Sequence, residues 1–159
     1  MHTAYDNPYA SDPLRGAIWE MCVRRDLEAF LTADWNICAG DFVDEGFVGW
    51  NAHFVSDSMK WTVGFPTLTA YRETWLSDAR AFAAKVWAAD TRERLYRALT
   101  LARIDFASDS ILVHKRFDGA LYLTDGSEQT LRWQSLFVLR RIGGRWKQAG
   151  FIGYLPFSK

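Results

Sequence analysis

After residue 98 the chain consists of apolar runs separated by short turn signals, and this pattern limits the fold more than any other feature. The runs are rich in branched and aromatic residues, which strands favour. Because the turns between them are too short for a crossover, neighbouring strands are expected to pair antiparallel. The predicted strands cover 99–107, 110–118, 119–124, 128–141 and 145–155.

The first half of the chain shows helical spacing instead. Asp12 followed by Pro13 fits an N-cap with proline at the first helical position, and apolar residues then recur at helical spacing as far as Leu31. A break is expected near 24–25. The clearest helix follows Pro66, where one apolar stripe recurs at intervals of three and four: Leu68, Tyr71, Trp75, Ala79, Phe82 and Val86. Helices followed by a run of strands predict an α+β domain.

Length and charge limit the organisation and the partners. A chain of 159 residues is the size of one domain, and we expect a flexible N-terminal tail at 1–12 before a single domain at 13–159. The 19 basic and 19 acidic residues balance, so no basic surface for nucleic acid is expected. No stretch approaches the roughly 18 apolar residues of a membrane span, and we expect a cytoplasmic protein without a membrane partner.

Three stretches carry a resemblance to a known family. Asp34 and Trp35 lead through Phe42 to an apolar strand at 46–51, a helix follows from Pro66, and the last hairpin at 135–146 reads Ser-Leu-Phe-Val-Leu-Arg-Arg-Ile-Gly-Gly-Arg-Trp. In these features the chain resembles the nuclear transport factor 2-like superfamily of SnoaL-like polyketide cyclases, ketosteroid isomerase and scytalone dehydratase. The resemblance implies a cone-shaped, strongly curved antiparallel sheet wrapped around three to four N-terminal helices, with a pocket inside.

The resemblance also limits the chemistry. Ketosteroid isomerase-like members keep a carboxylate base near the end of the first strand, where this chain has Trp50 and Asn51. Neither residue can take a proton from carbon at neutral pH, which argues against steroid-isomerase chemistry. The two cysteines and three histidines are scattered, so we expect no metal site and no cofactor.

Alternation along the strands predicts which residues face the pocket. On the last strand, Gln148, Gly150, Ile152 and Tyr154 share one side. With residues from the long strand, the Pro66 helix and the first strand, the predicted ligand-binding set is Trp50, Tyr71, Trp75, Trp133, Ser135, Phe137 and Ile152. A wall of this kind suits a small apolar or aromatic molecule, although an aromatic stripe is also the ordinary make-up of a core.

The candidate catalytic residues are Tyr154, His53 and Asp105. Tyr154, together with Tyr71, would donate a hydrogen bond to a developing oxyanion. His53 lies just after the first strand and is either an acid–base group at the pocket mouth or an exposed loop histidine. Asp105 is either an inward general base with a raised pKa or one half of a surface ion pair with Arg103.

Three functions remain open. The chain is a cofactor-independent cyclase, dehydratase or isomerase-like enzyme, a non-catalytic ligand-binding module, or a structural small subunit of a larger enzyme such as a ring-hydroxylating dioxygenase. Under any of them, the convex face of the sheet is expected to pair in a homodimer, with Leu136 and Val138 on the side opposite to the pocket.

Overall fold

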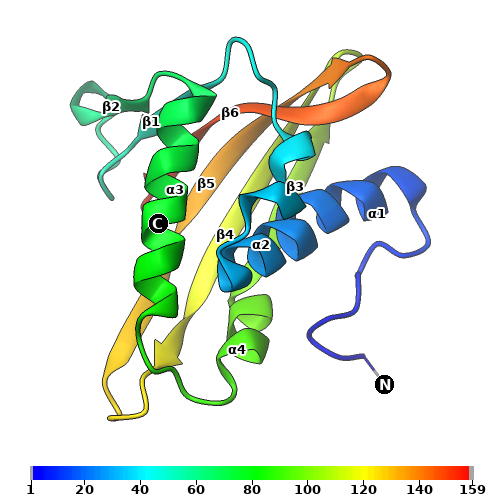
Figure 1. Cartoon of the computed structure of the whole chain (residues 1–159). Helices are drawn as coiled ribbons and strands as arrows, with labels where there is room; N and C mark the ends of the chain where they lie inside the picture. The colour runs from blue at the N-terminus through cyan, green and yellow to red at the C-terminus, as the bar shows by residue number, and fades with distance from the viewer. Residues whose placement is uncertain (1, 158–159) are drawn as a thin grey trace.

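The structure is a computed structural model that describes residues 2–157 (Figure 1). Its first half is mainly helical and its second half is mainly strand, as the sequence predicts. In chain order the elements are α1 (Pro13–Trp19), a π-helical turn η1 (Glu20–Arg25), α2 (Asp26–Thr32), the 3-10 turns η2 (Trp35–Ile37) and η3 (Ala39–Asp41), β1 (Val48–Asn51), the 3-10 turn η4 (Ser58–Lys60), β2 (Thr62–Phe65), α3 (Leu68–Ala83), α4 (Thr91–Ala98), β3 (Leu99–Phe106), β4 (Ser110–Tyr122), β5 (Glu128–Ile142) and β6 (Arg145–Leu155).

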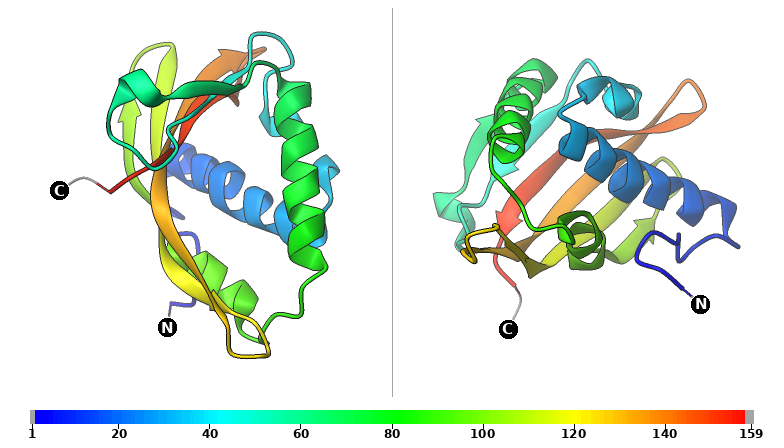
Figure 2. Two further views of the ribbon diagram at one scale, coloured as in Figure 1. Left: turned by 90° about the vertical axis from the view of Figure 1, so that its left-hand side faces the viewer. Right: turned by 60° about the horizontal axis from the view of Figure 1, so that its bottom comes forward.

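Within residues 2–157 six strands form one sheet in the order β2-β1-β6-β5-β4-β3. The four strands after residue 98 pair antiparallel with their sequence neighbours, as predicted. The exception to an all-antiparallel sheet is β1, which pairs with β6 in parallel. The sheet is therefore mixed and open, and its strong curvature gives it a concave and a convex face (Figure 2).

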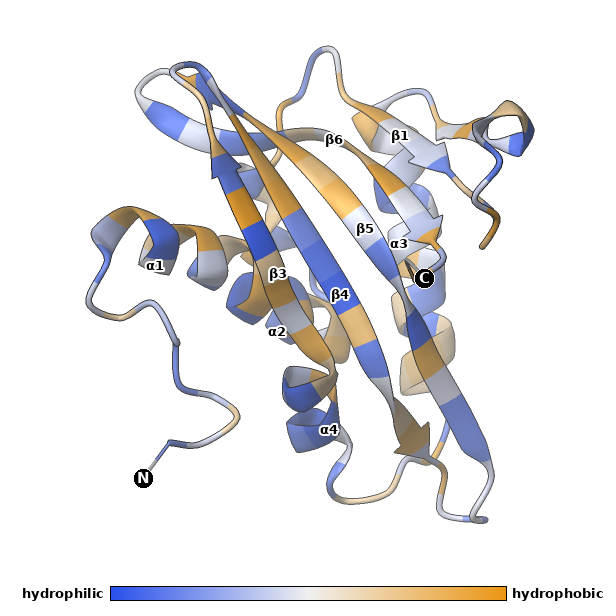
Figure 3. Cartoon of the chain, turned by 180° about the vertical axis from the view of Figure 1, so that it is seen from behind, coloured by the Kyte–Doolittle hydropathy of each residue, from blue (hydrophilic) through white to orange (hydrophobic). Residues whose placement is uncertain are grey.

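All the longer helices lie on the concave face (Figure 2). The segment α1–η1–α2 crosses the sheet, and α3 runs along it at the side of β1 and β2 (Figure 1). Their buried side chains meet those of the sheet in one core that includes Ile18, Val23, Ile111, Val113 and Leu139. Over the described residues the convex face is left uncovered by helices (Figure 3). None of the helices in residues 2–157 combines the length and the apolar character that a membrane span requires.

Two element boundaries differ from the prediction. The turn expected at 118–119 does not exist, because β4 continues through Gly119, which pairs with Leu131. A Cβ at Gly119 would lie 2.9 Å from the Cβ of Ala98, so this glycine allows α4 to pack onto the strand. The Pro66 helix ends at Ala83 instead of Val86, because the carbonyl of Val86 accepts a hydrogen bond from the Thr124 amide in the β4–β5 turn.

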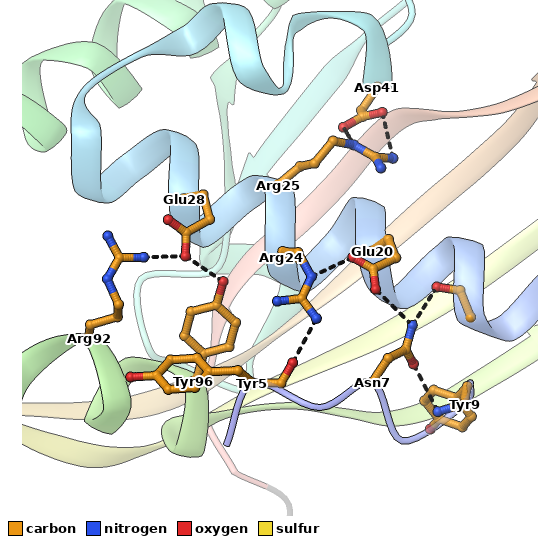
Figure 4. A network of polar contacts seen from close by, with 11 residues as sticks. Tyr5, Asn7, Tyr9, Glu20, Arg24, Arg25, Glu28, Asp41, Arg92 and Tyr96 are labelled. Atoms are coloured by element: carbon orange, nitrogen blue, oxygen red, sulfur yellow. Dashed lines mark hydrogen bonds and ion pairs between the residues drawn. The ribbon is translucent and has the colours of Figure 1, made fainter. Parts of the chain in front are cut away.

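The segment expected to be a flexible tail lies against α1 and α4 (Figure 4). Asn7 donates to the carbonyl of Gly16 at 3.0 Å, and the Tyr9 hydroxyl donates to the carbonyl of Leu101 at 3.3 Å. The ring of Tyr5 meets Tyr96 edge to face at a centroid distance of 4.9 Å. The domain therefore holds this segment in the structure, and its mobility in solution stays a prediction.

Candidate functional site

A cavity of about 400 Å³ lies between α2, α3 and the concave face of β4, β5 and β6. This volume is within the range of small-molecule sites. Most of its wall is aromatic, and the rings come from the helices and the sheet alike. They belong to Phe30, Phe65, Tyr71, Trp75, Phe82, Trp87, Phe117, Trp133, Phe137, Phe151 and Tyr154.

A β-bulge in β6 changes which residues face this cavity. Leu139 pairs with Gln148, but Val138 pairs with Gly150, so β6 carries one extra residue at this point. After the bulge Phe151 lies opposite Phe137 and lines the cavity. Ile152 therefore lies on the convex face, and simple alternation from Gln148 onwards does not hold.

A second irregularity in β6 returns Tyr154 to the cavity. Between the pairs Leu136–Ile152 and Gln134–Leu155, β6 again has one residue more than β5. Tyr154 takes a left-handed backbone conformation there, with φ of 57°, which is costly for a residue with a side chain. Its ring lies 5.7 Å from that of Trp133 and lines the cavity.

The structure brings together many of the residues that the sequence singles out. Tyr154 from the catalytic set lines the cavity, and so do five of the predicted ligand-binding residues: Tyr71, Trp75, Trp133, Ser135 and Phe137. Trp50 and Ile152 do not, because they pair with each other on the convex face, where Trp50 is 41% exposed.

His53 and Asp105 also lie away from the cavity. His53 is exposed after β1, and its Nε2 atom is 2.7 Å from the Thr62 hydroxyl. Asp105 accepts a hydrogen bond from Arg103 at 2.7 Å and lies 3.2 Å from His114. These partners, Arg103 first, lower the pKa of Asp105. This is the surface ion pair of the two alternatives for Asp105.

An ion pair inside the cavity is absent from the predicted set. Lys115 on β4 is 3% exposed, and its Nζ atom donates to Oδ2 of Asp26 at 3.2 Å. The same ammonium lies 4.7 Å from the centre of the Phe137 ring. Both Asp26 and Lys115 line the cavity, and Ser135 pairs with Lys115 across the strands.

A signal for Lys115 is present in the sequence. Its neighbours at 114 and 116 suggest a polar surface, yet Lys115 shares its face with Val113 and Phe117, which are buried and half-buried. Asp26 gave no such signal. It is the first residue of α2, directly after the π-helical turn η1, and such turns are frequent at functional sites.

Comparison with solved structures identifies the fold. An NTF2-like protein of unknown function from Pseudomonas putida matches with a TM-score of 0.60 and 17% identity, over 96% of this chain and 92% of that one. A ketosteroid isomerase-like protein from Erwinia carotovora atroseptica matches with a TM-score of 0.54 and 19% identity, over 90% and 96%. The chain has an NTF2-like fold. The fold-level resemblance predicted from the sequence is thereby confirmed.

Other comparisons add no function to this NTF2-like chain. A conserved protein from Planctomyces limnophilus matches with a TM-score of 0.57 and 16% identity, over 91% of this chain and 95% of that one. No protein-family model matches the sequence, and no curated protein matches it. At identities this low the likeness shows the fold alone, and the NTF2-like fold does not specify a reaction.

Two tyrosine hydroxyls in this NTF2-like cavity are available to a ligand. Burial raises the pKa of Tyr71 well above its ordinary value. Burial also raises the pKa of Tyr154, and the charge of Asp78 adds to the effect. Both phenols therefore stay protonated and can donate. Within the described part of the chain neither hydroxyl makes a hydrogen bond.

The rim of the cavity carries its own polar groups, on the exposed side of α3 and just after its end. Thr74, Asp78 and Lys85 line the cavity and are exposed, and Gln129 faces them from the start of β5. Partial burial raises the pKa of Asp78. Across residues 2–157 no group of three His, Cys, Asp or Glu side chains is placed to hold a metal ion.

Proposed function

We propose that the cavity binds a small apolar or aromatic molecule and that the protein catalyses cofactor-independent proton transfer on it, the chemistry common to isomerases, dehydratases and cyclases. The observation that carries the proposal is the Asp26–Lys115 ion pair in the wall of an aromatic cavity. A buried ion pair contributes little to stability compared with an apolar pair of the same volume. Its position among rings is better explained by chemistry on a bound molecule.

The pair supplies the two groups that enolisation needs. Asp26 Oδ1 accepts no hydrogen bond from the described residues, so this atom can take a proton from a carbon next to a carbonyl. The electrons of that C–H bond move towards the carbonyl oxygen, which becomes an enolate. The Lys115 ammonium and the Tyr71 and Tyr154 hydroxyls would stabilise this oxygen. Asp26 then returns the proton to the same carbon or to another one.

The apolar wall supports this chemistry. Phe137 and Phe151 stack with a centroid distance of 5.1 Å, and Phe117 and Trp133 stack at 4.6 Å, so the rings close the sheet side of the cavity. Excluding water lowers the local dielectric constant and strengthens the interaction of Lys115 with a developing negative charge. Planar rings also match the shape of an aromatic or fused-ring substrate.

Deuterium exchange tests the proposal without knowledge of the natural substrate. The protein is incubated in D2O with 1-tetralone or 1-indanone, whose binding is first checked by calorimetry, and exchange at the α-carbon is followed by NMR. We expect exchange above the buffer rate and a loss of about 10²- to 10⁴-fold in Asp26→Asn. Lys115→Met should lose most of the rate, and Asp44→Asn, at an exposed loop position, is the matched control.

A ketone that binds without exchange would contradict the enzyme and favour the second candidate, a non-catalytic binding module. One observation favours that candidate: Asp26 and Lys115 already neutralise each other. If the protein is such a binding module, Tyr154→Phe would lower the affinity for the ketone only slightly. No variant would alter the rate of deuterium exchange at the α-carbon. The structural small subunit and the cytoplasmic location stay predictions, which co-purification of a larger subunit and microscopy of a tagged chain would test.

The proposal includes a homodimer through the convex face (Figure 3). Strand pairing places an apolar stripe across β1, β6, β5 and β4 on this face: Val48, Trp50, Ile152, Leu136, Val138 and Leu112. Charges of both signs flank the stripe on β3 and β4, among them Arg103, Asp105 and Arg116. A surface with both signs can pair with a second copy of itself about a two-fold axis.

Light scattering tests the dimer. It should give the mass of a dimer for the parent protein and of a monomer for Trp50→Asp. An unchanged mass in Trp50→Asp would place the interface elsewhere.

A further inference from the structure

Four charged side chains line the cavity at two levels. Lys115 lies deep and is almost completely buried, and its partner Asp26 is half-buried. Asp78 on α3 and Lys85, two residues after the end of α3, lie at the rim, where both are exposed. The formal charges of these four residues sum to zero. Whether the cavity prefers a cationic or an anionic ligand therefore depends on which of the charges already have a partner.

Two of these four charges form an ion pair, and a third lies over a ring. Lys115 and Asp26 pair with each other at 3.2 Å. Lys85 lies over the ring of Trp87 at 5.9 Å from its centre. Asp78 makes no ion pair and no side-chain hydrogen bond within residues 2–157. Within residues 2–157, Asp78 and Lys85 thus both lack an ion-pair partner, and of the two only the Asp78 carboxylate has no ring contact and is open to an incoming ligand.

The rings around Asp78 are arranged for a cation. On α3, Asp78 is three residues after Trp75 and four before Phe82, so the carboxylate shares a helix face with two cavity rings. Lys85 over Trp87 and Lys115 over Phe137 show that ring faces of this wall already hold ammonium groups. An ammonium ligand would gain both the carboxylate and the ring faces, the combination used by aromatic cages.

We propose that the ligand of this cavity is an amphipathic aromatic amine, whose ammonium group pairs with Asp78 at the rim while its rings fill the aromatic interior. The inference rests on the proposed small-molecule function and adds the charge of the ligand to it. Anionic aromatic molecules are disfavoured, because Asp78 repels them at the entrance, Lys115 is already neutralised by Asp26, and Lys85 lies over the Trp87 ring.

Three probes with one naphthalene frame test the charge preference: 1-naphthylmethylamine as the cation, 1-naphthalenemethanol as the neutral molecule and 1-naphthoate as the anion. Calorimetry on the full chain should show the amine binding about tenfold more tightly than the alcohol, and the carboxylate most weakly. Asp78→Asn should lower the affinity for the amine to that for the alcohol and leave the affinity for the alcohol unchanged. Asp78→Glu should restore part of the preference.

Glu73→Gln is the matched control, because Glu73 is an exposed acid on α3 outside the cavity wall. Equal binding of amine and alcohol would overturn the charge inference and leave the binding proposal standing. Tightest binding of the carboxylate would also overturn it and would point to Lys115 as the anchor. If none of the probes binds, the small-molecule proposal itself fails. Asp78 is exposed and unpaired, so Asp78→Asn should fold normally, which circular dichroism checks.

Discussion

Two consecutive residues of one helical segment, Arg25 and Asp26, enter ion pairs of opposite character. Arg25 donates to both carboxylate oxygens of Asp41, at 2.7 and 3.0 Å (Figure 4). Asp41 also accepts a hydrogen bond from Arg145 at 3.2 Å. Asp41 is 1% exposed and fully satisfied. Asp26 has a single bond to Lys115 and faces a cavity. The first pair joins η1 to η3 and to the β5–β6 hairpin, whereas the second leaves acceptor capacity open for a bound molecule.

The largest effect on stability is expected at Asp41. Asp41→Asn removes the buried charge that holds two arginines, and urea unfolding should show a loss of about 2 kcal/mol. The value is below that of a completely buried pair because Arg25 is 37% exposed. If the free energy of unfolding changes by less than the experimental error, the Arg25–Asp41 pair does not stabilise the fold. The proposed difference between the two ion pairs is then wrong.

A smaller effect of opposite sign is expected at the other pair. The double variant Asp26→Leu, Lys115→Met replaces the cavity ion pair by apolar side chains of similar size. It should unfold at equal or higher urea concentration, with a gain of up to about 1–2 kcal/mol, while deuterium exchange into 1-tetralone is lost. A strongly destabilised double variant would show that the Asp26–Lys115 pair is structural too.

Thiol reactivity is a second measurement that depends on both ion pairs. Cys22 is completely buried, and burial raises its pKa to about 12. Smaller contributions to that pKa come from all four charged residues of the two pairs. At pH 8 the native thiol should therefore react very slowly with Ellman's reagent.

The same reagent separates the two kinds of pair. In Asp41→Asn the rate should rise about 30-fold if reaction follows global opening, since each 1.4 kcal/mol is a factor of ten. In the double cavity variant the rate should equal that of the parent protein or be lower, because its stability is expected to be equal or higher. A fast reaction in the double variant would mean that the cavity pair also protects the core.

Local patterns in the sequence predicted the order of elements and much of the cavity wall. The spacing of Leu68, Tyr71 and Trp75 identifies α3 and its inward face, and the glycine turn at 143–144 identifies the last hairpin. The pairing of β1 with β6 was not predicted, because a short strand in the first half gives no sign of a parallel partner a hundred residues away. Long-range pairing of this kind has no local signature.

The site was harder to predict than the fold. Alternation along β5 correctly groups Trp133, Ser135 and Phe137, which all line the cavity, because their strand is regular. Alternation along β6 fails at Ile152, because a bulge has no sequence signal as strong as a turn. Asp26 was missed because a helix that bends through a π-helical turn does not keep one hydrophobic face.

The two bulges of β6 give the cavity an unusual route of variation. If β6 slipped by one residue after Gln148, so that Ala149 instead of Gly150 paired with Val138, Ile152 would turn inward and Phe151 outward. The bulge at Ala149 thus decides whether an aromatic or an aliphatic side chain of β6 lines the cavity, and the register of this one strand sets the chemistry of the wall.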